Sequence, residues 1–269
     1  MESHMVAVFL TYLGGGAVAG LFAGLFGIGG GVVIVPILVF CLTLQGISDQ
    51  FIMHLALGTS MASISFTAAS SFWAHHRRGA VHWLMVRRIT PGILTGAFLG
   101  SFLASHLSTN ILKGLLVVFL FYVATQMFMN GEPKSAHGMP GQLAMFGAGN
   151  TIGAISSLVG IGGGTLSVPF MMWCNLTLHH AIGTSAAIGF PIAVAGALGY
   201  IYNGLGVSGL PEFSLGYTYL PALAGIVASS VFTAPLGVRL AHSLPVGKLK
   251  RVFALFLALM GTRMLMTMF

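Results

Sequence analysis

Long apolar runs recur along the whole chain, and they constrain its fold more than any other feature. Runs such as 52–74, 82–105 and 110–130 follow one another with only short polar connections. A helix needs about 20 apolar residues to cross a bilayer core of about 30 Å. Composition agrees, because 56% of the residues are hydrophobic and 6% are charged, against about 25% charged in an ordinary globular domain. The sequence therefore predicts an all-α polytopic membrane protein.

The chain also contains an internal repeat. The segment GIGGGVVIVP at 27–36 returns as GIGGGTLSVP at 160–169. The segment HLALGTS at 54–60 returns as HHAIGTS at 179–185. Self-similarity of this kind indicates one structural unit that is used twice. The expected helical segments are 5–26, 32–44, 52–74, 82–105, 110–130, 142–159, 165–175, 180–202, 216–240 and 247–268.

Basic residues indicate how the two units are oriented. Cytoplasmic loops of membrane proteins carry an excess of Lys and Arg, so connections flanked by these residues are expected inside. The loops that hold Asp49 and Glu212 contain no Lys or Arg and are expected outside. Equivalent segments of the two units then cross in opposite directions, which makes the repeats inverted. The basic residues at the three inner connections are Arg77, Arg78, Arg87, Arg88, Lys134, Arg239, Lys248, Lys250 and Arg251.

Each repeat is predicted to contain a Gly-broken helical hairpin followed by three transmembrane helices. The first inverted repeat covers 1–133, a cytoplasmic linker covers 134–141, and the second inverted repeat covers 142–269. The charge pattern requires 142–175 to enter the membrane and return to the same side. A re-entrant hairpin and two tilted passes both satisfy this requirement, and inversion places the corresponding hairpin of 5–44 on the outer side.

The two glycine clusters interrupt the backbone at membrane depth. Irregular backbone is tolerated there only where it is buried in protein or lines a cavity. Each cluster precedes a helix whose first amides are unpaired and whose dipole presents positive potential. Two such helix ends from opposite sides would form an anion site. The predicted substrate-binding glycines are Gly27, Gly29, Gly30, Gly31, Gly160, Gly162, Gly163 and Gly164.

Other glycines have the four-residue spacing that is typical of close helix packing in membranes. We interpret them as packing residues, because the doubled GIGGG cluster followed by Pro36 and Pro169 is a far more specific pattern. A nucleotide-binding role for the clusters is excluded, since no soluble βαβ unit surrounds them. The glycines assigned to packing are Gly16, Gly20, Gly24, Gly92, Gly96, Gly100, Gly149 and Gly153.

Two repeated hydroxyl pairs extend the predicted site. Thr59 and Ser60 occupy the same places near the start of a helix as Thr184 and Ser185. Their hydroxyls are suited to donate hydrogen bonds to the oxygens of an anion. The alternative is that they bond to carbonyls of their own helix, as Ser and Thr commonly do in membranes.

The remaining polar residues favour an anion and give no sign of catalysis. All four acidic residues fall at the terminus or in predicted loops, whereas a cation site or a proton relay normally needs a carboxylate inside the membrane. No metal-ligand spacing and no nucleophile with a base appear, so we expect no enzyme activity and no cofactor. The expected partners are a small anion and the lipid bilayer, without nucleic acid, and the small-residue faces would permit a homodimer.

The paired turns, the paired Gly-Thr-Ser motifs and the inverted halves resemble the TauE/SafE sulfite exporter family, also called the four-toluene sulfonate uptake permeases. The resemblance covers nearly the whole chain. It implies transport of a small organosulfur or sulfur-oxyanion, such as sulfite, sulfoacetate or a related sulfonate, across a prokaryotic inner membrane. We expect a secondary transporter that exports its anion by alternating access. The alternative is an anion channel or a permease for another small anion.

Overall fold

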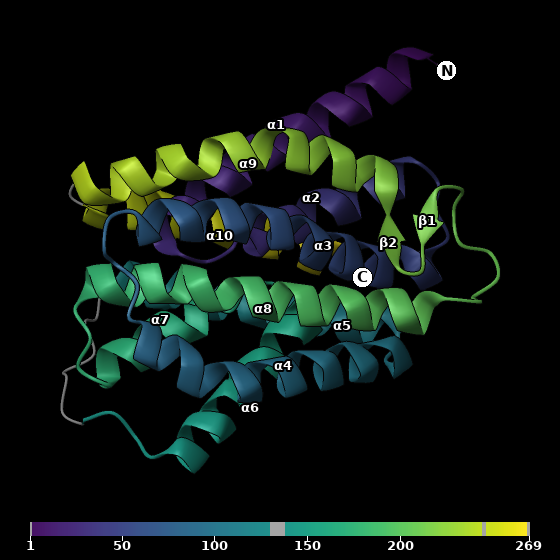
Figure 1. The fold of residues 1–269 in the computed structure, drawn as a ribbon. Helices are drawn as coiled ribbons and strands as arrows, with labels where there is room; N and C mark the ends of the chain where they lie inside the picture. The colour runs from purple at the N-terminus through teal and green to yellow at the C-terminus, as the bar shows by residue number, and fades with distance from the viewer. Residues whose placement is uncertain (1, 130–137, 244–245, 268–269) are drawn as a thin grey trace.

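The computed structural model describes residues 2–129, 138–243 and 246–267. Within these residues the chain forms ten helices and one two-stranded hairpin (Figure 1). The elements are α1 (Glu2–Phe26), α2 (Gly31–Leu44), α3 (Asp49–His76), α4 (Trp83–His106), α5 (Thr109–Met129), α6 (Gln142–Val159), α7 (Gly164–Trp173), α8 (Leu178–Gly204), β1 (Ser214–Leu215), β2 (Thr218–Tyr219), α9 (Leu220–Ser243) and α10 (Val246–Met266).

Helix boundaries follow the apolar runs of the sequence closely. Helix α6 covers 142–159, the range that the sequence predicts. The largest shift is at α9, which begins at Leu220 rather than at residue 216. The cause is the hairpin, in which Ser214 pairs with Tyr219 around Gly216 at φ +54°. This hairpin was not predicted, because each of its strands is only two residues long.

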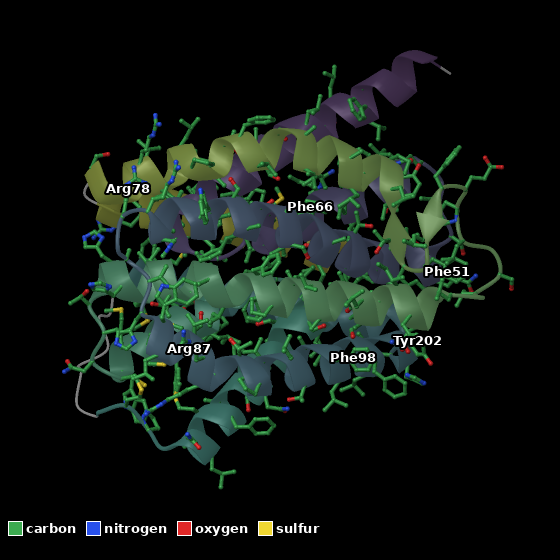
Figure 2. The ribbon with its side chains drawn as sticks, viewed as in Figure 1. Phe51, Phe66, Arg78, Arg87, Phe98 and Tyr202 are labelled. Atoms are coloured by element: carbon green, nitrogen blue, oxygen red, sulfur yellow. The ribbon has the colours of Figure 1, made fainter. Side chains whose placement is uncertain are left out.

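Among the described helices, five are long and apolar enough to cross a membrane. Large apolar side chains also remain exposed on the outer faces of the bundle, such as Phe98 on α4 (Figure 2) and Phe232 on α9. Such broad apolar exposure suits contact with lipid rather than with water. The fold is therefore that of a multi-pass membrane protein. The five spans are Ala7–Phe26, Asp49–His76, Thr109–Met129, Leu178–Gly204 and Leu220–Ala241.

The two predicted halves of the chain interleave. Helices α3 and α8 pack side by side at the centre of the bundle (Figure 1). Helix α1 packs along α9 on one flank, and α6 packs along α4 on the other. Helix α5 packs against α10. Each of these pairs joins a helix from the first half to one from the second, so neither half forms a separate body.

Glycine stripes allow two of these helix pairs to approach closely. A Cβ atom at Gly20 of α1 would meet the backbone carbonyl of Ser230 in α9. A Cβ atom at Gly96 of α4 would meet the backbone carbonyl of Asn150 in α6. The packing role predicted for these glycines is thus confirmed, and it explains how backbones can touch without side chains between them.

The two ends of the bundle differ in charge. Arg78 and Arg87 lie at one end, whereas Phe51 and Tyr202 lie at the opposite end (Figure 2). Asp49 is an exposed residue in the first turn of α3, not a loop residue as predicted, because the helix begins three residues earlier than the apolar run. Lys134, Glu132 and residues 134–137 of the predicted linker lie outside the described residues, as do the side chains of Glu2, Lys248 and Lys250.

Candidate functional site

The two glycine turns meet inside the bundle. A Cβ atom at Gly29 would lie 2.9 Å from the Cα atom of Gly162, and the reverse distance is also 2.9 Å. Gly31 faces the carbonyl oxygen of Gly160, and Gly164 faces the carbonyl oxygen of Gly27. All eight predicted glycines are buried. The structure therefore brings the predicted turn residues of both halves together at one junction, which we call the glycine junction (27–31 and 160–164).

Left-handed backbone explains why glycine is needed there. Gly30 and Gly163 are the N-cap residues of α2 and α7, with φ of +82° and +77°. Gly27, Gly29 and Gly160 also have positive φ, a conformation that other residues adopt only with strain. Both short helices begin at the junction, so their first amides lack a partner within the helix and their positive dipole ends lie there.

Serine hydroxyls tie each turn to the opposite half. Ser60 Oγ in α3 donates a hydrogen bond of 2.7 Å to the carbonyl of Gly160. Ser185 Oγ in α8 donates one of 3.0 Å to the carbonyl of Gly27. Both serines are fully buried. The sequence predicts substrate or the serines' own helix as the acceptor, but in this structure each serine bonds to the turn of the other half.

The preceding threonines hold the connections that lead into α9 and α4. Thr59 Oγ1 accepts a hydrogen bond of 2.8 Å from the backbone N–H of Tyr219. Thr184 Oγ1 accepts one of 2.9 Å from the backbone N–H of His82. Burial raises the pKa of the Tyr219 phenol above its ordinary value. All four predicted hydroxyl residues thus lie at or near the junction and make matched contacts in the two halves.

A group of hydroxyls in the second half was missed by the sequence analysis. Ser167 Oγ lies 2.8 Å from Ser185 Oγ. The hydroxyls of Ser156, Ser157 and Thr165 are buried and have no hydrogen-bond partner within the described part of the chain. A residue-by-residue comparison of the repeats could have found them, because the corresponding first-half positions are apolar or glycine. Those positions are Ala23 for Ser156, Gly24 for Ser157, Val32 for Thr165 and Ile34 for Ser167.

The repeated histidines and cysteines differ in their surroundings. His54 is buried, and its ring centroid lies 5.0 Å from that of Tyr217, whereas His179 is exposed. Cys41 and Cys174 are buried free thiols. The residues that the structure describes contain no group of three His, Cys, Asp or Glu side chains suited to a metal ion.

An arginine-lined hollow of about 390 Å³ opens beside the end of α3 that bears the basic residues. Arg77 also lies over the Trp73 ring, 5.7 Å from its centroid. Arg87 lies at the same end of the bundle (Figure 2) but is not among the lining residues. We call the hollow beside α3 the arginine hollow. Its lining residues are Ser70, Trp73, Ala74, Arg77, Arg78, Pro235 and Arg239.

The family comparison agrees with this architecture. The model of the family described as sulfite exporter TauE/SafE matches residues 12–264. The chain belongs to this family. The match includes both glycine turns and all ten helices except the ends of the first and last.

Two relatives cover this TauE/SafE chain almost completely. A probable membrane transporter protein of Haemophilus influenzae is 39% identical over 93% of this chain and 95% of its own length. A probable membrane transporter protein of Methanocaldococcus jannaschii is 26% identical over 93% of each chain. No solved structure matches the chain. Family and relatives together indicate a membrane transporter rather than an enzyme.

Proposed function

We propose that the chain is a secondary transporter that exports a small sulfur-containing anion, such as sulfite, sulfoacetate or a related sulfonate, across the prokaryotic inner membrane. The anion binds at the glycine junction and is exposed alternately to each side. The observation that carries the proposal is the contact between Gly29 and Gly162, because it places the starts of α2 and α7 together inside the bundle. Two positive helix ends at membrane depth are suited to a small anion.

Helix pairing supports two repeated halves, 1–133 and 142–269, and the opposite directions of α3 and α8 support their inversion (Figure 1). If α1 to α5 correspond in order to α6 to α10, the pair α1 and α9 corresponds to α6 and α4. The contacts of α3 with α9 likewise correspond to those of α8 with α4. Single residues follow the same exchange, since Gly16 faces Ile226 and its counterpart Gly149 faces Ile89. Such pseudo-symmetry is the usual basis of alternating access.

Contact between the turns favours a carrier over an open channel. Backbone atoms of both halves occupy the centre of the junction, so a continuous path needs the halves to move apart. Export needs no coupling ion, because a negative interior drives a monoanion outward with about 2.3 kcal/mol per 100 mV. The described acidic residues agree with this, since Asp49 and Glu212 are both exposed.

Electrogenic flux in proteoliposomes tests the proposal. Currents are recorded after concentration jumps of sulfite and sulfoacetate, with acetate and the zwitterion taurine as controls. We expect a saturable current with the sulfur anions only, together with counterflow of labelled sulfite, which a channel does not support. Folded protein that gives neither sulfite current nor sulfite counterflow would overturn the proposal.

Variants Gly30→Ala and Gly163→Ala connect that current to the junction. Both residues have positive φ, and a Cβ atom at Gly30 would lie 2.8 Å from the carbonyl oxygen of Ala19. We expect the sulfite current to be lost in each variant. Thermal stability and monodispersity are measured alongside, so that a loss of folding is separated from a loss of transport.

A further inference from the structure

The two halves of the glycine junction differ in polarity. In the second half, Ser156 and Thr165 flank the turn that leads into α7. In the first half, the corresponding residues at the turn into α2 are Ala23 and Val32, which are both buried. Thus neither of these two positions at the start of α2 carries a hydroxyl, whereas both positions at the start of α7 do.

The hydroxyls of Ser156 and Thr165 lack protein partners. Ser156 is 0% exposed and Thr165 is 5% exposed, so water does not reach them freely. Neither hydroxyl has a hydrogen-bond partner among the described residues. Proteins pair nearly all buried polar groups, and the exceptions commonly mark sites for a ligand, an ion or water. By contrast, the hydroxyls of Ser60 and Ser185 donate to carbonyls of the glycine junction.

Both hydroxyls lie at the start of α7. Thr165 is the second residue of the helix, and Gly163 is its N-cap. Ser156 Oγ lies 3.1 Å from the position that a Cβ atom of Gly163 would take. The first amides of α7 have no acceptor within the helix, and they share this location with the positive end of its dipole. Hydroxyl and amide donors therefore lie at the same end of α7.

Space for a ligand at this point depends on one side chain. The atom nearest to a Cβ built on Gly163 is Cδ1 of Ile192, the far end of a flexible side chain. Ile192 is fully buried, so a ligand beside Gly163 needs this side chain to shift within the core. At Gly30, in contrast, the nearest atoms are the backbone carbonyl of Ala19.

We propose that the anion binds asymmetrically, at the start of α7, where Ser156 and Thr165 donate hydrogen bonds to its oxygens. The inference rests on the proposed function and adds to it which half holds the substrate. Its ligand class is a small anion with several oxygens, such as the sulfite ion or a sulfonate group, because two hydroxyls and the unpaired helix amides can each donate a hydrogen bond to an anion oxygen. The start of α2 packs against the turn and donates no side-chain hydrogen bond to the anion.

Substitutions that copy the first half provide the test. Ser156→Ala and Thr165→Val install the residues that the chain already has at Ala23 and Val32. Thr165→Ser retains the hydroxyl. Ser63→Ala is a matched control, because Ser63 is an equally buried serine whose hydroxyl bonds to the carbonyl of Thr59 in its own helix. Sulfite affinity is measured from the ligand-dependent thermal shift and from the substrate dependence of the current.

We expect each of Ser156→Ala and Thr165→Val to weaken sulfite affinity by about 10-fold, as for loss of a hydrogen bond to a charged group. Ser63→Ala should retain the affinity of the wild-type protein, and Thr165→Ser, which keeps the hydroxyl, should lose much less affinity than Thr165→Val. Stability without sulfite should not fall in Ser156→Ala, since no protein partner loses a bond. If wild-type protein binds sulfite and the double variant binds it equally well, the asymmetric site is wrong. If wild-type protein neither binds nor transports sulfur anions, the proposed function itself is wrong.

Discussion

Ser60 and Gly160 connect the two halves of the chain directly, because Ser60 Oγ donates to the Gly160 carbonyl across 2.7 Å. Ser185 and Gly27 form the reciprocal bond. Carbonyls in a non-helical turn receive no hydrogen bond from an N–H group of their own helix, and lipid has no donor to replace it. The two serines therefore satisfy carbonyls of the buried, irregular backbone of the junction, and they tie each turn to the central helix of the other half.

Loss of a junction serine is expected to destabilise the fold. Ser60→Ala removes the donor and leaves the Gly160 carbonyl buried, which should cost about 1–3 kcal/mol of stability. Thermal unfolding in detergent or nanodiscs measures this. Ser63→Ala is the control, because the carbonyl that it releases belongs to Thr59 within the same helix. Equal stability of the two variants would show that the bond between the halves contributes nothing.

A substitution at Gly162 tests the contact between the two turns without adding backbone strain. It has no positive φ, yet its Cβ atom would lie 2.9 Å from the Cα atom of Gly29. Neither backbone can retreat easily, so Gly162→Ala should destabilise the protein by about 1–3 kcal/mol, the range for overpacking. Thermal unfolding is again the measurement. Gly147→Ala in α6 is the control, since no atom lies within 4 Å of its Cβ position, and a stability loss in Gly162→Ala no greater than in this control would argue against tight contact.

The repeated motifs made much of this arrangement predictable. Apolar runs define the helices, because transmembrane length and hydrophobicity leave few alternatives. The GIGGG clusters predicted two interacting turns, and the contact of Gly29 with Gly162 agrees. The acceptors of Ser60 and Ser185 could not be predicted, because they lie on the opposite half and depend on three-dimensional packing. Ser156 and Thr165 were not predicted for another reason. The prediction rested on motifs that the two repeats share, and these residues stand at positions where the repeats differ.

Arginines of the hollow should speed the capture of anions at low ionic strength. Arg78→Gln and Arg239→Gln each remove a positive charge from its lining. We expect kcat/KM for sulfite from that side to fall by about threefold to 10-fold in dilute buffer and by much less at high salt, because screening weakens steering. Arg87→Gln is the matched control, an exposed arginine at the same end that does not line the hollow (Figure 2). An equal effect of all three substitutions would mean that the net charge of this end of the bundle, and not the arginine hollow, determines the rate of capture.

Neutralisation of the described carboxylates should leave transport intact. Asp49 lies in the first turn of α3 and Glu212 lies before the β1–β2 hairpin, and both are exposed. Proton-coupled carriers commonly use a carboxylate buried within the membrane, and these two are not in such a place. Asp49→Asn and Glu212→Gln should therefore retain sulfite flux within about twofold, as for ordinary surface substitutions. The flux is measured between pH 6 and 8, with and without an imposed membrane potential. Loss of flux in a variant that remains folded would mean that an exposed carboxylate takes part in coupling, and export driven by the membrane potential alone would then be wrong.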